Sequence, residues 1–118
     1  MSTANVIRIV TTTDTARAVG SGDLDVLGTP VLIAWCEAAT CAALDLAAGQ
    51  TSVGTRVDIQ HLAASPVGTE VTVTAEIEHL DDRRARFVVG AIDSSGTEVA
   101  RGTVERAIVD RERFLSRL

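Results

Sequence analysis

The sequence is constrained most by residues 30–48, PVLIAWCEAATCAALDLAA, a segment that is apolar on nearly every side. Good helix formers dominate it, which predicts one long buried helix rather than an amphipathic surface helix. Thr29 is expected to be its N-cap, Pro30 suits the first helical position because its missing N–H is not needed there, and Gly49 stands where a C-terminal cap belongs. Glu37 lies near the middle and, with the many alanines, favours a helix enclosed by protein over one that crosses a membrane.

After this helix, apolar residues recur at every second position, which is typical of half-buried strands. Residues 80–82 and 93–96 are short polar turns that suit antiparallel hairpins. A further strand is expected before the helix, around residues 6–12, and a helical turn near residues 111–118. The four strands predicted after the helix are residues 53–62, 69–79, 83–92 and 97–109.

The predicted order is therefore a strand, a long apolar helix and four strands joined mostly by hairpins. A helix that is apolar all round needs cover, which a curved antiparallel sheet of about five strands wrapped around it supplies. This α+β arrangement is the hotdog fold, and 118 residues fit one such domain, residues 1–118. The edge strands and one side of the helix would stay partly uncovered, so a homodimer is expected, and a tetramer agrees with the same argument.

Charge argues against a nucleic-acid partner, because the formal net charge is -5. The basic residues Arg83, Arg84 and Arg86 do form a local cluster, beside Asp81 and Asp82. Such a cluster is either a solvated hairpin or a contact for the phosphates of a nucleotide-bearing substrate.

The first residues lack a basic leader, an apolar stretch and a small-residue cleavage site, so a cytoplasmic location is expected. Cys36 and Cys41 lie five positions apart on the predicted helix, where their side chains diverge, which makes a disulfide between them implausible. Both are expected to be small buried apolar residues. No group of residues has metal-ligand spacing, since His61 and His79 are the only histidines.

Glu37 and His61 are polar residues on apolar faces. No residue three or four positions from Glu37 is basic, so its carboxylate is expected to be desolvated, which favours the neutral form. Alternatively, Glu37 points through a gap to solvent or bonds to a neighbouring strand. His61 shares a strand face with Val57 and Ile59. It is either a satisfied core residue or the partner of Glu37 in an acid–base site, whereas His79, beside a charged turn, is expected to be exposed.

Thr29 and Gly54 each have two interpretations. Thr29 is either only a cap, or it lies where the positive end of the helix dipole stabilises a developing oxyanion. Gly54 is either an ordinary strand glycine or a point where a ligand approaches the backbone. Glu37 follows Thr29 by eight positions, about 12 Å along a helix axis. The two cannot bond directly, so a substrate group or water fills the gap, or one of them comes from a partner subunit.

At these positions the sequence resembles the hotdog thioesterases typified by fluoroacetyl-CoA thioesterase and its broader relatives. The matching segments are residues 27–39, 52–77 and 101–114, which span most of the chain. The pattern is more specific than any of its members, and it consists of Thr29, Glu37, Gly54-Thr55, His61, Pro66 and Gly68.

The resemblance implies an acyl-CoA thioesterase that converts a small or medium acyl-CoA to the free acid and CoA. It implies that Thr29, Glu37 and His61 form the hydrolytic site, that Gly54 contacts the acyl group and that Arg106 lies by the bound thioester. No metal or cofactor is expected, because no cluster of residues has metal-ligand spacing, and coenzyme A is part of the substrate. Glu37 is then either the nucleophile, through an anhydride, or the general base for a water.

Two departures separate the chain from the fluoroacetyl-specific enzymes. No aromatic residue occurs between Ser21 and Gly28, where those enzymes carry an aromatic gate, and Val104 replaces a histidine. The resemblance therefore does not extend to selectivity for a fluorinated acyl group. The competing interpretation is a non-catalytic protein that binds acyl-CoA or another small ligand on the same dimeric fold.

Overall fold

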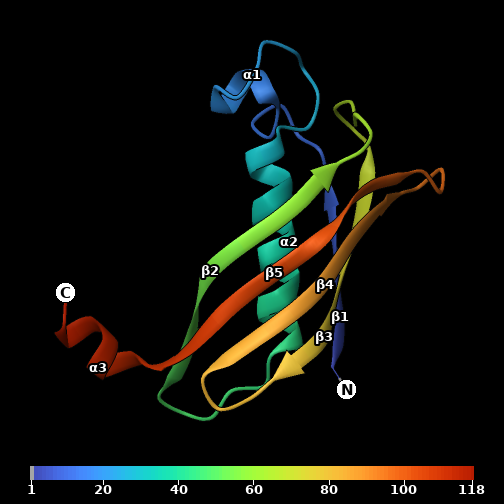
Figure 1. The fold of residues 1–118 in the computed structure, drawn as a ribbon. Coiled ribbons are helices and arrows are strands. Elements are labelled where there is room, and N and C mark those ends of the chain that lie inside the picture. The colour runs from blue at the N-terminus through green and yellow to red at the C-terminus, as the bar shows by residue number, and fades with distance from the viewer. Residues whose placement is uncertain (1) are drawn as a thin grey trace.

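A computed structural model describes residues 2–118 (Figure 1). Five strands and three helices follow one another with the long helix near the beginning of the chain. They are β1 (Thr3–Ile9), α1 (Ala16–Val19), α2 (Thr29–Ala43), β2 (Gln50–His61), β3 (Glu70–Leu80), β4 (Arg84–Asp93), β5 (Glu98–Asp110) and α3 (Arg111–Ser116).

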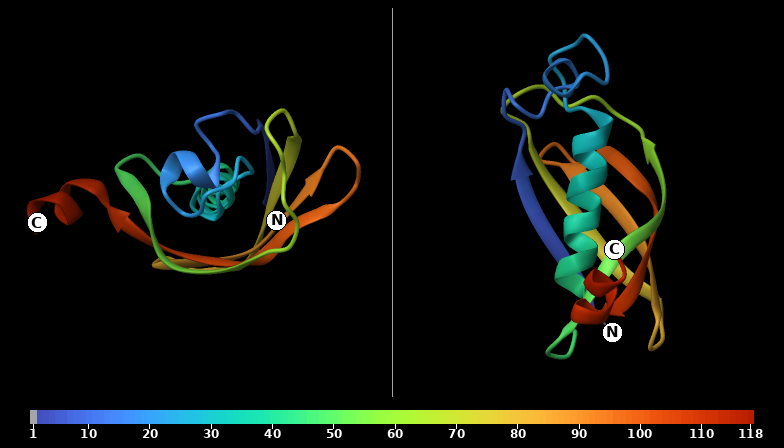
Figure 2. Two further views of the ribbon diagram at one scale, coloured as in Figure 1. Left: turned by 90° about the horizontal axis from the view of Figure 1, so that it is seen from above. Right: turned by 90° about the vertical axis from the view of Figure 1, so that its left-hand side faces the viewer.

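All neighbouring strands are antiparallel, in the order β1-β3-β4-β5-β2. The sheet curves around α2, which lies along its concave side and contacts all five strands (Figure 2). The predicted hotdog arrangement is confirmed. Strands β1 and β2 are the edges of the sheet, and each has one side that no other strand covers.

The core lies between α2 and the middle of the sheet. Strands β3 and β4 alternate buried and more exposed residues as their sequences predict, because one face of each packs against the helix. Phe87, Leu32 and Cys36 are fully buried there. The buried strand residues are Val71, Val73, Ala75 and Ile77 on β3 and Ala85, Phe87, Val89 and Ala91 on β4.

Helix α2 is shorter than predicted and begins one residue earlier. Its N-cap is Gly28, not Thr29, and its C-cap is Leu44, whose backbone is extended. Gly49 is not a cap: it has a φ of 85° in the turn that leads into β2, a conformation that glycine adopts without strain. No helix among residues 2–118 is long and apolar enough to cross a membrane.

Strand β2 departs most from the expected pattern. Its register shifts between Gly54 and Arg56, so the alternation is interrupted by a bulge. Val57, predicted to face the core, is 37% exposed because β2 is an edge strand. The first strand also lies earlier than expected, at Thr3–Ile9, and the short helix α1, capped by Thr15, was not anticipated.

Candidate active site

Glu37 lies in the middle of α2, and its carboxylate is held by strand β5. Arg106 Nη1 donates a hydrogen bond to Glu37 Oε2 at 3.2 Å, and the two side chains are 8% and 35% exposed. Gly54 of β2 is paired with Arg106 in the sheet. A Cβ at position 54 would collide with Glu37 Oε2, so the carboxylate can lie against the sheet only because a glycine stands there. The close approach that Gly54 permits is made by Glu37 itself.

Arg106 is fixed by three contacts. Besides the bond to Glu37, its Nε donates to Ser52 Oγ at 2.9 Å and its Nη2 donates to the Ser52 carbonyl at 3.2 Å. The helix supplies no charge to compensate Glu37, as expected, and the alternative that Glu37 bonds to a neighbouring strand is confirmed, because Arg106 of β5 supplies that charge. A signal was present: Arg106 alternates with the apolar residues Val104 and Ile108, and an inward-facing arginine requires a partner.

Thr29 and His61 form a second cluster. Thr29 Oγ1 and His61 Nδ1 lie 2.8 Å apart, and they join the first residue of α2 to the last residue of β2. Thr29 is already the first residue of α2, the N-cap is Gly28, and no side chain caps the helix. The capping role predicted for Thr29 is therefore wrong. The hydroxyl of Thr29 is instead engaged with the imidazole.

His61 retains one nitrogen for chemistry. Burial lowers its pKa below the usual histidine value, and a weaker interaction with the backbone of Ala63 opposes that shift. The ring is therefore neutral at pH 7, with one donor and one acceptor nitrogen. Nδ1 faces Thr29, whereas Nε2 is buried and has no hydrogen-bond partner among residues 2–118. Such an orphaned nitrogen suits a ligand group that would accept or donate a proton.

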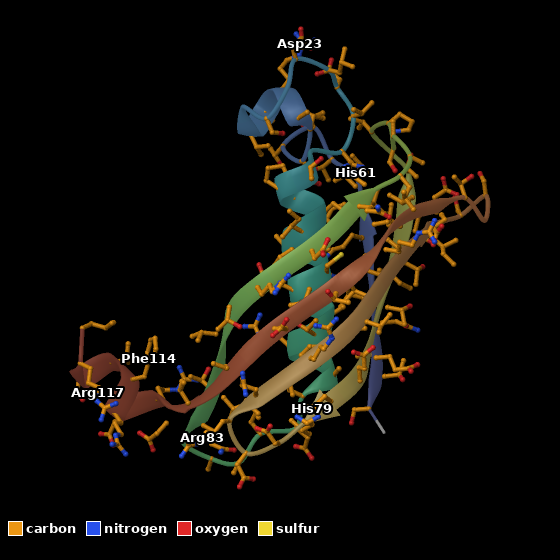
Figure 3. All side chains as sticks on the ribbon, in the orientation of Figure 1. Asp23, His61, His79, Arg83, Phe114 and Arg117 are labelled. Atoms are coloured by element: carbon orange, nitrogen blue, oxygen red, sulfur yellow. The ribbon has the colours of Figure 1, made fainter. Side chains whose placement is uncertain are left out.

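The two clusters do not meet within one chain. Helix α2 separates Thr29 from Glu37 by eight residues, about 12 Å along its axis. Strand β2 separates Gly54 from His61 by seven positions, roughly 20 Å in an extended strand. His61 accordingly lies at the end of β2, beside the start of α2 (Figure 3). The expected pairing of His61 with Glu37 is not made between residues of the same chain.

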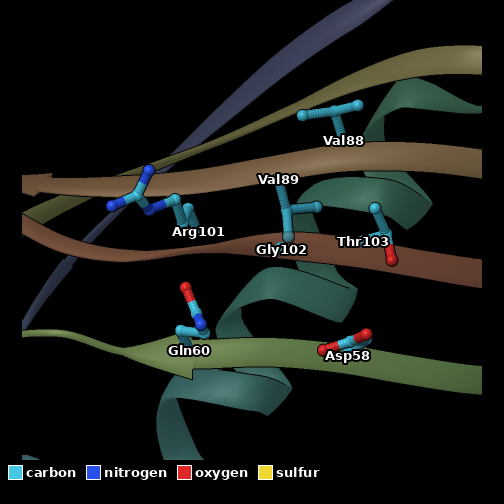
Figure 4. Close-up of a pocket in the computed structure, with 7 residues that line it drawn as sticks. All are labelled: Asp58, Gln60, Val88, Val89, Arg101, Gly102 and Thr103. Atoms are coloured by element: carbon cyan, nitrogen blue, oxygen red, sulfur yellow. The ribbon is translucent and has the colours of Figure 1, made fainter.

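A hollow of about 330 Å³ borders the Thr29–His61 cluster. The loop before α2 forms one wall of it through Ser21, Val26 and Leu27, and none of its lining residues is Phe, Trp or Tyr. A different hollow lies on the outer face of the sheet, with α2 behind the strands (Figure 4). Asp58, Arg101 and other residues line it. It is separated by the sheet from Glu37 and does not belong to the site.

The remaining candidate residues lie apart from both clusters. His79 is exposed, as predicted, and its Nε2 lies 2.9 Å from Asp81 in the β3–β4 hairpin. Cys36 is buried, and burial, assisted by the charge of Glu37, raises the pKa of its thiol to about 11, which makes it a poor nucleophile. Cys41 is exposed, contrary to expectation. Residues 2–118 contain no group of three or more potential metal ligands.

Solved structures with this arrangement define the class as hotdog-fold thioesterases. A fluoroacetyl-CoA thioesterase structure matches 98% of this chain and 90% of its own, with a TM-score of 0.89 and 30% sequence identity. A thioesterase superfamily member from Thermus thermophilus matches 97% of this chain and 85% of its own, with a TM-score of 0.89 and 25% identity.

The family can be named more narrowly. The model of the fluoroacetyl-CoA-specific thioesterase family matches residues 10–112, so the chain belongs to that family. A relative named fluoroacetyl-CoA thioesterase, from Streptantibioticus cattleyicolor, is 42% identical over 66 residues. That match covers 56% of this chain and 47% of the relative, so the aligned part spans about half of the relative's length.

Proposed function

We propose that this protein is an acyl-CoA thioesterase that hydrolyses a small or medium acyl-CoA to the free acid and CoA with Thr29, Glu37 and His61. The observation that carries the proposal is the carboxylate of Glu37, which Arg106 holds against the sheet at a position that only glycine permits. Relatives solved with acetyl-CoA and with fluoroacetate and CoA support an acyl-CoA substrate. Gly54 would then contact the acyl group and Arg106 the thioester.

The chemistry follows from the free atoms of the two clusters. Arg106 occupies Glu37 Oε2, and no residue among 2–118 bonds to Oε1. Oε1 either attacks the acyl carbon, giving an anhydride that water then opens, or takes a proton from a water that attacks instead. In both routes the carbon–sulfur bond breaks and the leaving sulfur needs a proton. His61, through Nε2, assists that proton transfer, and Thr29 orients the substrate and the ring.

The acyl group is proposed not to be restricted to fluoroacetyl. The hollow beside Thr29 and His61 is bordered by the loop that has no aromatic residue between Ser21 and Gly28. No aromatic gate therefore stands before the helix, and small or medium acyl chains are the proposed substrates. Comparing kcat/KM for acetyl-, fluoroacetyl-, butyryl- and hexanoyl-CoA tests this. A strong preference for fluoroacetyl over acetyl would contradict it.

The working form is proposed to be a homodimer, and a tetramer of such dimers agrees with the same argument. The free edge of β2 exposes backbone groups that a second β2 can pair with. If two copies of β2 pair antiparallel about an axis close to Val57, Gly54 of one copy lies near the partner's His61. Such a dimer unites the carboxylate of one chain with the imidazole of the other. A solution mass near the 12.4 kDa monomer would overturn it.

The protein is proposed to act in the cytoplasm as a single domain of residues 1–118, without metal, cofactor or nucleic acid. The rate of hydrolysis should be unchanged by a chelator. A rate that falls with the chelator and recovers when metal is added would contradict this.

The activity itself is tested by release of free thiol from a series of acyl-CoA esters. Catalytic turnover well beyond one thiol per chain is expected. The alternative, a non-catalytic protein that binds acyl-CoA or another small ligand, predicts saturable binding of acyl-CoA with no thiol release above the buffer rate.

A further inference from the structure

A wide groove lies away from both clusters, between the β3–β4 hairpin, the end of β5 and α3. It encloses about 680 Å³. Figure 3 shows Arg83 on the hairpin and Phe114 and Arg117 on α3, at the end of the molecule where α3 projects. The residues that line the groove are Arg83, Ile108, Val109, Asp110, Arg113, Phe114, Arg117 and Leu118.

The charge of this groove is opposite to that of the chain. The protein has 16 acidic and 11 basic residues, yet three arginines and a single aspartate line the groove. The guanidinium groups of Arg83, Arg113 and Arg117 make no ion pair or hydrogen bond with residues 2–118. Asp110 is partly engaged, since its Oδ1 accepts a hydrogen bond from the backbone N–H of Arg113 as the cap of α3. Because three guanidinium groups face one carboxylate, the side chains that line the groove carry a net positive charge.

Arg83 belongs to a basic cluster that the structure divides. Arg86 forms ion pairs with two carboxylates, Glu78 at 2.7 Å and Glu105 at 3.1 Å, so its charge is already compensated within the protein. Arg83 instead lines the groove with the two arginines of α3. If the hairpin were only a solvated turn, Arg83 would not be expected to line the same groove as Arg113 and Arg117, which are far from it in the sequence.

Among residues 2–118, Phe114 is the only Phe or Trp side chain that is not buried, and it lies in the groove. The chain has one Trp, two Phe and no Tyr. Trp35 and Phe87 are buried in the core, whereas Phe114 is half-buried and lines the groove. A flat ring beside several guanidinium groups matches a purine base that carries phosphates, because the base stacks and the phosphates pair with arginine.

The position of the groove suits one particular nucleotide. Arg106, which holds Glu37, and Ile108, which lines the groove, project from the same face of β5 two residues apart. That spacing is about 7 Å along the strand. The pantetheine arm of coenzyme A is longer than this spacing, so one extended molecule can reach from a thioester at Glu37 to a nucleotide in the groove.

We propose that the groove of Arg83, Arg113, Phe114 and Arg117 binds the 3′-phosphorylated ADP end of the acyl-CoA substrate. This inference rests on the proposed acyl-CoA hydrolysis and adds the site that recognises the carrier rather than the acyl group. The arginines pair with the phosphates, and Phe114 contacts the adenine.

The test compares two substrates that carry the same acyl group. One is the acyl-CoA that the wild-type protein hydrolyses best, and the other is the matching acyl-pantetheine, which has no nucleotide. The double variant Arg113→Gln/Arg117→Gln should raise KM for acyl-CoA by about 10-fold at unchanged kcat, and leave kcat/KM for acyl-pantetheine as in wild type. Arg101→Gln is the matched control, because Arg101 is also an exposed arginine but lies on β5, outside the groove.

Each outcome decides the proposal. Equal KM values of wild type and double variant for acyl-CoA would overturn the groove site while leaving the hydrolase function intact. A parallel loss with acyl-pantetheine, or a changed solution mass, would assign the arginines to folding or subunit contact and also overturn it. If wild type hydrolyses neither substrate, the proposed function fails. The groove is then judged alone by calorimetric binding of adenosine 3′,5′-bisphosphate, expected for wild type and Arg101→Gln and lost in the double variant.

Discussion

The two halves of the candidate site are built differently. Glu37 is locked between a helix and two strands, because the buried Arg106 bonds to it and to Ser52 while Gly54 leaves room for its carboxylate. Thr29 and His61 lie at the ends of their elements and are joined by one hydrogen bond, with Nε2 of the ring left without a protein partner. This difference matches the two roles proposed for these residues. Glu37, proposed to act on the acyl carbon, is fixed by its contacts, whereas His61, proposed to transfer protons, has a buried nitrogen without a partner among residues 2–118.

The largest effect is expected from Glu37→Gln. The amide keeps the shape of the side chain but cannot act as a nucleophile or base, so kcat should fall at least about 100-fold while the fold is retained. Glu105→Gln is the matched control, because Glu105 of β5 is also paired with an arginine, Arg86 of β4, at 3.1 Å and lies outside both clusters. A Glu37→Gln enzyme with more than about a tenth of the wild-type kcat would contradict the assigned role.

A smaller decrease of kcat, up to about 100-fold, is expected from His61→Gln.

His61 should also make the stability of the fold depend on pH. Because burial lowers the pKa of His61, the wild-type ring should stay neutral at pH 7 and titrate only below the usual pH 6.5. The unfolded chain then binds the proton first, so the free energy of unfolding should decrease as the pH falls from about 6.5 through the lower folded pKa. Urea titrations at pH 7.5 and pH 5 should show this decrease in wild type and less of it in His61→Gln. An equal decrease in both would rule out His61 as its source.

Much of the fold could be predicted, because hydrophobic periodicity reports directly on which face of an element is covered. The strands β3 and β4 each have one face on α2, and their alternation gave the correct inward residues. Periodicity failed at β2, where a free edge and a bulge leave residues such as Val57 exposed. It also could not find the end of α2, since the apolar residues after Ala43 continue the helical composition in an extended backbone.

The site could be predicted in part. Glu37 and His61 were identifiable as polar residues on apolar faces, and Thr29 as a residue at the helix start. Their partners were not, because the pairings of Arg106 with Glu37 and of Thr29 with His61 span 69 and 32 positions. Contacts of that range depend on sheet order and register, which a single sequence does not specify.

Two glycines separate catalysis from stability. Gly54→Ala should lower kcat about 10-fold with little change in Tm, because the added methyl displaces the flexible end of Glu37 rather than backbone. Gly102→Ala places its methyl against the backbone of Asp58 and should instead destabilise the fold by about 1–3 kcal/mol. Measuring kcat and Tm for both variants checks the contrast. A Gly54→Ala protein with wild-type kcat would show that the close approach of Glu37 does not matter.

The smallest effect is expected from Ser52→Ala. It removes the hydroxyl that accepts from Arg106 Nε but keeps the Ser52 carbonyl, so Arg106 loses one of its three contacts. One hydrogen bond contributes about 1 kcal/mol, so kcat should fall about 3- to 5-fold. Thr55→Ala is the control, since the Thr55 hydroxyl donates to the backbone carbonyl of Glu105 and to no other group among residues 2–118. Equal effects of the two changes would show that Ser52 does not act through Arg106.

The central claim is that the two halves work together across two copies of the chain, and mixed dimers test it most directly. Co-expression of Glu37→Gln with His61→Ala gives mixed dimers in which one site has both an intact Glu37 and the partner's His61. With random pairing, the mixture should recover about a quarter of wild-type activity, while each variant alone stays nearly inactive. If the mixture is no more active than its parents although mixed dimers form, the site is made within one chain and the account is wrong.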